Sequence, residues 1–184
     1  MNKRGSLSYG NLMVILWVSY GKGRERPGKW LQNDIGLYRG LYRMIRFTTD
    51  SIEMPALDER QIGRWLRAVA ADYGFSVGNI NYIFCSDERE LEVNRQFLGH
   101  DYYTDIITFD YSTPSTLNGD IFISLDTVRS NAEMVGVSFE EELRRILIHG
   151  VLHLTGQGDK TPETKAEMTE KEERALCRFR ELGS

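Results

Sequence analysis

The stretch from Ser138 to Gly156 constrains this chain more than any other, because the sequence specifies both of its ends. Ser138 and Glu141 have the spacing of a capping box, in which the side chain of each residue accepts a hydrogen bond from the free backbone N–H of the other. Gly156 is a residue type that commonly ends a helix. The sequence therefore predicts one long helix over residues 138–155.

Two of the three histidines in the chain lie inside this predicted helix. His149 and His153 are four residues apart, which places them one above the other on a single helical face. The short turn after Gly156 can carry Asp159 back beneath that face, giving the pattern His-x3-His-x5-Asp. Imidazole and carboxylate are ordinary zinc ligands, and a catalytic zinc needs three protein ligands and an open position for water.

A metal site competes here with a plainer interpretation. His149 and His153 can be two partly buried histidines on an amphipathic helix, with Asp159 a loop acid. A bare His-x3-His pair favours that interpretation, but the added Gly156 and Asp159 favour the metal site. We therefore predict one Zn²⁺ per chain on His149, His153 and Asp159, with manganese and nickel left open.

The residue after the first histidine bears on the chemistry. In zinc peptidases of the His-Glu-x-x-His type, this glutamate takes the proton from the bound water. Here that position is Gly150, so peptide hydrolysis by that mechanism is disfavoured. Phosphodiester cleavage stays open, because a metal can both activate water and offset the charge that develops on the phosphate.

The chain from Met44 onward alternates strand-like and helical patterns. Four segments have strand-like composition, at 45–48, 80–85, 104–111 and 120–124. Apolar residues at helical spacing, with Asp58 as the cap of the first helix, predict helices at 58–73, 87–98, 126–135, 138–155 and 162–181. The expected fold is α/β (α+β): a small mixed sheet of about four strands flanked by about five helices, with the metal site on the long helix and the following turn.

The first 43 residues differ from the rest in composition. Residues 1–46 hold nine Lys and Arg against two acids, and they contain one short apolar run at 12–18. Three interpretations compete: a signal peptide, which the missing cleavage site disfavours; an ordered strand at 12–18; and a poorly ordered extension. We favour the extension over 1–43, which a start codon upstream of the true one at Met44 would explain, followed by a single domain over 44–184.

Charge and cysteine content bear on RNA binding and on the redox compartment of the protein. Residues 47–184 hold fourteen basic and twenty-five acidic residues, which argues against tight autonomous RNA binding but leaves a local basic groove open. Cys85 and Cys177 form no disulfide framework and predict buried free thiols in a reducing compartment. No stretch approaches the ~18 apolar residues of a membrane span.

Three separated motifs resemble those of the bacterial YbeY family of ribosomal-RNA maturation endoribonucleases, in the family's order and spacing over about residues 45 to 181. They are HGVLHLTG at 149–156, the segment Asn94 to Phe109 with Asp101, Tyr103-Thr104-Asp105 and Ile107-Thr108-Phe109, and Gly119-Asp120-Ile121. The resemblance implies an α/β domain that holds zinc and acts on single-stranded RNA in the cytoplasm. It also implies partners: ribosomal RNA precursor, the small ribosomal subunit and its assembly factors, with no membrane.

Two positions depart from the family's pattern. The third ligand is usually histidine, and Asp159 in its place would make a zinc-bound water a weaker acid. The family also usually has an arginine, thought to contact phosphate, where this chain has Leu98. The candidate substitutes for this phosphate contact are Arg95, His100, Arg144 and Arg145, although a solvated helix surface is the plainer account of the last two.

Thr104 and Asp105 match the family as well, and capping of the turn before a strand is as good an account of them as catalysis. The leading hypothesis is a metal-dependent endoribonuclease for ribosomal RNA maturation and ribosome quality control, in which a zinc-bound water held by His149, His153 and Asp159 attacks a phosphodiester. The alternative is a ribosome-assembly factor with a structural metal and little cleavage. A zinc peptidase is the third, which Gly150 disfavours.

Overall fold

The computed structural model describes residues 16–19, 44–99 and 101–183 of the chain. In these residues one mixed sheet has the strand order β1-β4-β5-β3-β2, in which β4 and β5 are antiparallel and the other neighbours are parallel. The strands are β1 Leu16–Ser19, β2 Ile45–Thr49, β3 Ser76–Cys85, β4 Ile106–Asp110 and β5 Thr116–Ser124. The helices are α1 Glu59–Asp72, α2 Asp87–Leu98, α3 Leu125–Val135, α4 Phe139–Leu154 and α5 Pro162–Leu182.

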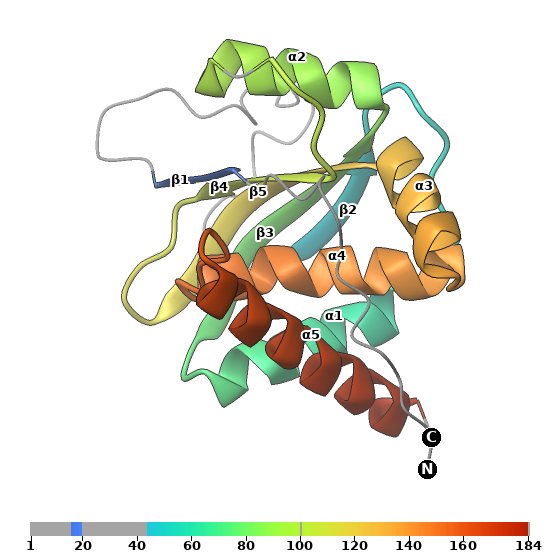
Figure 1. The fold of residues 1–184 in the computed structure, drawn as a ribbon. Helices are drawn as coiled ribbons and strands as arrows, with labels where there is room; N and C mark the ends of the chain where they lie inside the picture. The colour runs from blue at the N-terminus through green and yellow to red at the C-terminus, as the bar shows by residue number, and fades with distance from the viewer. Residues whose placement is uncertain (1–15, 20–43, 100, 184) are drawn as a thin grey trace.

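Helices cover both faces of the sheet (Figure 1). Helices α1, α4 and α5 lie on one side, where the larger hydrophobic core includes Trp65, Tyr82 and Ile146. Helix α2 lies on the other side, over a smaller core that includes Val93 and Phe109. The α/β architecture predicted from the sequence is therefore confirmed, with α4 in the middle of the larger layer.

All five predicted helices are present, whereas the sheet differs from the prediction in extent. Strands β3 and β5 begin earlier than predicted, and β1 is a fifth strand that pairs in parallel with β4. Residues 16–19 of the segment 1–43 form this strand, because the edge of β4 can pair with a short segment through backbone hydrogen bonds alone. The extension over 1–43 as a whole stays a prediction. The other residues of 1–43 lie outside the described part of the chain.

Helix α4 begins where the sequence predicts, but only one of the two hydrogen bonds of the predicted capping box forms. The Ser138 hydroxyl oxygen accepts from the Glu141 backbone N–H at 3.1 Å. The Glu141 side chain is instead 3.6 Å from Arg180 of α5 in an ion pair. A reciprocal box forms at the start of α5, between Thr161 and Thr164.

Two glycines allow α4 to lie very close to the sheet. A Cβ atom on Gly150 would lie 3.0 Å from Ile121 and 3.1 Å from Ile106, and one on Gly119 of β5 would lie 3.0 Å from Leu154. A larger side chain at either position would push the helix away from β4 and β5. The glycines therefore set the distance between the histidine helix and the sheet.

The two cysteines differ in exposure. Cys85 is buried in β3, as predicted, and burial raises the pKa of its thiol. Cys177 is exposed, so the prediction of two buried thiols is wrong for this residue, because its neighbours Ala175 and Leu176 occupy the buried side of α5. No helix in the described ranges is long and apolar enough to cross a membrane.

A buried carboxyl group on α2 makes stability depend on pH. Glu90 is fully buried, and its Oε2 accepts from the Thr104 backbone N–H at 3.3 Å. Its Oε1 has no hydrogen-bond partner among the described residues. Burial raises the pKa of Glu90 from 4.5 to about 8, with the Thr104 N–H lowering it and the charges of Asp105 and Asp87 raising it further. The folded chain therefore keeps a proton that the unfolded chain releases, so stability falls as pH rises through this interval.

Replacement of Glu90 by glutamine should remove this loss of stability at high pH. The amide can still accept from Thr104 and carries no charge, so Glu90→Gln should raise the free energy of unfolding at pH 9 by about 2 kcal/mol, and by much less near pH 5. Urea unfolding of both proteins at the two pH values measures the difference. A stability gap that is the same at both pH values would contradict the assignment.

Candidate metal centre

His149 and His153 lie on the face of α4 that is turned toward α5 and the following turn. Their side chains are 1% and 2% exposed, and their Nε2 atoms are 2.8 Å apart. Two imidazoles meet in this way because residues four apart on a helix project from neighbouring turns. The pair is therefore a buried site in which both Nε2 atoms point to one place.

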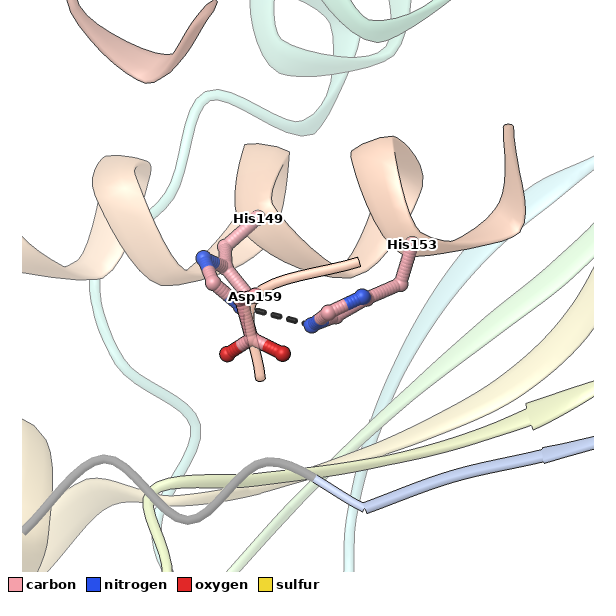
Figure 2. Close-up of side chains that lie close together, drawn as sticks. All are labelled: His149, His153 and Asp159. Carbon is pink, nitrogen blue, oxygen red and sulfur yellow. Dashed lines mark hydrogen bonds between the residues drawn. The ribbon is translucent and has the colours of Figure 1, made fainter. Parts of the chain in front are cut away.

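The turn after α4 brings in the third group. Gly156 has a φ of +92°, a left-handed conformation that glycine adopts without steric cost, and it reverses the chain direction. The reversal places the backbone oxygen of Gln157 where it accepts from Nδ1 of His153 at 2.8 Å. Asp159 then lies against both rings, as Figure 2 shows, and the candidate ligand atoms of His149, His153 and Asp159 all lie within 4.8 Å of one another.

A carboxylate from α5 orients the first histidine. Nδ1 of His149 lies 2.5 Å from Oε1 of Glu172, which accepts the hydrogen bond. The other oxygen of Glu172 accepts from Arg145 at 3.3 Å, and the same guanidinium bonds Glu173 at 2.7 Å. Glu172 is 4% and Arg145 6% exposed, so a buried chain of contacts runs from Arg145 through Glu172 to His149.

The pKa values of the two histidines are shifted in opposite directions. Burial lowers the pKa of His149, but the hydrogen bond and charge of Glu172, with the charges of Asp105 and Asp159, raise it above its ordinary value. Burial and the charge of His149 lower the pKa of His153 to about 3. The charge of Glu172 therefore favours a proton on His149, whereas burial beside His149 disfavours one on His153.

These donors fit a metal ion. Each histidine uses Nδ1 for a fixed acceptor, so each presents Nε2 to the shared position, and a carboxylate completes the set. A carboxylate or carbonyl on the far nitrogen of each ring is the usual arrangement around a metal-binding histidine. A metal ion would take the place of the proton between the rings. The group of His149, His153 and Asp159 is therefore a possible metal site.

One more buried acid lies near this group. Asp105, just before β4, is fully buried, and its Oδ1 accepts from the Thr104 hydroxyl at 3.3 Å. Its Oδ2 receives no hydrogen bond from any described residue. Burial raises the pKa of Asp105, and the charge of His149 lowers it. Thr104 and Asp105 thus hold the turn, as the structural interpretation predicted, and Asp105 also acts on a candidate ligand.

Comparison with known proteins shows which family the chain belongs to. The sequence model of the family described as Endoribonuclease YbeY matches residues 44–180, about three quarters of the chain. This chain belongs to the YbeY family.

Curated YbeY endoribonucleases cover the same part of the chain. The protein from Bacteroides thetaiotaomicron is 53% identical over 133 residues, which are 72% of this chain and 97% of that protein. The one from Parabacteroides distasonis is 54% identical over 133 residues, 72% of this chain and 94% of its own length. The solution structure of TM1509 from Thermotoga maritima has a TM-score of 0.54 at 27% identity, covering 74% of this chain and 89% of that one. Membership of the YbeY family supports an endoribonuclease role.

Of the residues that we predicted as phosphate contacts, Arg95, Arg144 and Arg145 lie in the described part of the chain, and each already has a partner there. Arg95 is exposed and pairs with Asp101 at 2.6 Å. Arg144 lies over the ring of Phe179, and the pocket that it lines contains no residue of the metal group. Arg145 is buried behind Glu172, so its contacts are those of a positioning residue. His100 and the side chain of Leu98 lie outside the described part of the chain.

Glu172 is the residue of this site that sequence reasoning missed. It lies on the buried face of α5 with Met168, Ala175 and Leu176, at the spacing of an apolar stripe. A single acid within such a stripe is the signal that could have found it, because a buried charge needs a partner.

The contact with His149 makes Glu172 important for metal affinity. Glu172→Gln should weaken zinc binding roughly 10- to 100-fold, because the amide orients the ring less strongly and supplies no charge. Glu173→Gln is the matched control, since Glu173 bonds the same Arg145 but makes no bond to His149. Competition with a chelating dye measures both affinities, and equal zinc affinities in the two variants would contradict this role.

Proposed function

We propose that this YbeY-family chain is a single-strand-specific, zinc-dependent endoribonuclease that acts in ribosomal RNA maturation and ribosome quality control in the cytoplasm. The observation that carries the proposal is the convergence of His149, His153 and Asp159 within 4.8 Å in a member of an endoribonuclease family. When bound there, zinc would acidify a coordinated water toward a pKa of ~7 and offset the charge that develops on the phosphate.

The two histidines would hold the ion through Nε2, while hydrogen bonds at Nδ1 keep their rings in place. His149 and His153 have their Nδ1 atoms fixed by Glu172 and Gln157, so the rings need little reorganisation to bind. Asp159 adds one negative charge, and Glu172 balances the positive charge of the neighbouring Arg145. These groups preorganise a site for a divalent cation.

Asp105 is the acid best placed to serve the reaction itself. It comes from the strand side of the site, is fully buried, and has an oxygen free to accept a hydrogen bond. Its charge influences His149, so it lies near the candidate ligands. We propose that this oxygen orients a nucleophilic water by accepting one of its protons as a hydrogen bond.

The packing of α4 argues against the peptidase alternative. A glutamate at position 150 would point toward Ile106 and Ile121, where a Cβ atom alone would lie only 3.1 and 3.0 Å from their side chains. The proton acceptor of the His-Glu-x-x-His enzymes therefore has no place on this helix. Phosphodiester hydrolysis, which agrees with the family, is the chemistry that we propose.

The depth of the site supports a single-stranded substrate. The two histidines are almost fully buried and Asp159 is half-buried, so little of the site is open to a bulky substrate. A single strand can bend to bring one phosphate to such a site more readily than a paired helix, which is stiff. Since residues 47–184 are strongly acidic, we propose that the small ribosomal subunit and its assembly factors present the RNA.

Metal content and cleavage, measured together, test the proposed enzyme. The wild-type chain should contain near one zinc and cleave ribosomal RNA precursor, and His149→Ala and Asp159→Ala should each lose both. The exposed residue Met134 gives a control, because Met134→Ala should change neither property. Metal retained by Asp159→Ala would remove Asp159 from the ligand set, and a wild-type chain with zinc but without cleavage would favour the assembly-factor alternative.

The aspartate ligand should also set the pH range of the reaction. A carboxylate makes the site less positive than a third histidine would, so the bound water should be the weaker acid in this chain. Asp159→His should therefore shift the acidic limb of the pH–rate profile to lower pH while zinc stays bound. Rate profiles of the two zinc-loaded proteins check this, and an unchanged acidic limb would count against an Asp159 ligand.

A further inference from the structure

Two tyrosines are exposed side by side in the loop between α2 and β4. Tyr102 and Tyr103 are 36% and 46% exposed, and both belong to the small set of large apolar side chains that are exposed in the described part of the chain. A substantial part of each ring therefore stays in water, where it contributes nothing to folding. Their exposure is therefore better explained by binding of a ligand than by a contribution to folding.

Hydrogen bonds to buried side chains hold the backbone of this loop in place. The buried Asn94 donates its side-chain N–H to the Tyr102 carbonyl at 2.8 Å, and Glu90 accepts from the Thr104 N–H at 3.3 Å. At the end of the loop, the Ser124 N–H donates to the Asp105 carbonyl at 3.1 Å. The loop thus presents the rings from a fixed base, which reduces the entropy lost when a ligand binds.

The same loop leads directly to the metal group. Tyr103 precedes Asp105 by two residues, a distance of at most about 7 Å along an extended chain. Asp105 in turn lies close enough to His149 to influence the charge state of that ring. Tyr103 therefore lies close along the chain to an acid that is itself near the candidate ligands.

The charge of the surroundings favours a base over a phosphate as the ligand of these rings. Arg95, in the last turn of α2, is already paired with Asp101 at 2.6 Å, and residues 47–184 are acidic overall. Stacking of a nucleobase on an aromatic ring needs no positive charge and tolerates different sequences. A protein partner would need a contact area far larger than two side chains.

We propose that Tyr103, with Tyr102 beside it, is a stacking platform for a base of the single-stranded RNA next to the phosphate that enters the metal group. The inference rests on the proposed function, since it assigns the substrate contact of that same site. It gives the chain an uncharged source of RNA affinity in the loop that follows Leu98, the position at which the resemblance led us to expect an arginine. The platform would also hold the strand in position for cleavage.

Binding of short fluorescein-labelled single-stranded RNA to the zinc-loaded full chain tests the platform. Tyr103→Ala should bind roughly 5- to 150-fold more weakly, the loss expected for one stacked base, whereas Tyr103→Phe should bind like the wild type. An oligomer with abasic sites should bind the wild type and Tyr103→Ala equally. In cleavage assays the variant should raise KM more than it lowers kcat.

Controls separate this proposal from the proposed function. Met134→Ala removes another exposed apolar side chain and should leave RNA affinity unchanged, and all variants should keep the zinc content and melting temperature of the wild type. If the wild type binds and cleaves RNA while Tyr103→Ala does the same with equal affinity, the platform is wrong and the proposed function stands; the tyrosines would then serve another surface, such as a protein contact. Absence of RNA binding by the wild type would overturn the platform, and only absence of cleavage as well would overturn the proposed function.

Discussion

The close approach of α4 to the sheet is the constraint on which the rest of this structure depends. Gly150 lies between the two histidines, and the lack of a side chain there lets the helix lie directly on Ile106 and Ile121. The apolar face of α4 is then fully buried, so His149 and His153 are fixed in rotation about the helix axis. A helix held at a greater distance would bury less surface and leave the angle of the rings undetermined.

Burial of α4 leaves charged side chains that need partners, and α5 supplies one. A buried arginine and a buried histidine both require partners, because an unpaired charge loses its hydration without compensation. Glu172 is a partner for both, since its two oxygens accept from Arg145 and His149 respectively. The same carboxylate therefore stabilises the contact between two helices and orients a candidate metal ligand, which joins the stability of the fold to the geometry of the site.

The parts of the structure that the sequence predicts well are those set by local patterns. The range of α4, the facing histidines and the return of Asp159 all follow from residues within one continuous segment, through helical spacing and the conformation of Gly156. Contacts between distant segments were not predictable in this way. Glu172 reaches His149 across 23 residues, β1 pairs with β4 across about 90, and Arg145 is buried because α5 covers it.

The candidate site offers little positive charge to an RNA phosphate. Asp159 is a carboxylate, and Leu98 is apolar at the position where the resemblance led us to expect an arginine. Such a site attracts RNA weakly through charge, and the acidic domain around it does not compensate. Affinity must then come from contacts that need no charge or from a partner that delivers the strand. The exposed rings of Tyr102 and Tyr103, on a hydrogen-bonded loop that leads to Asp105, are suited to the first of these.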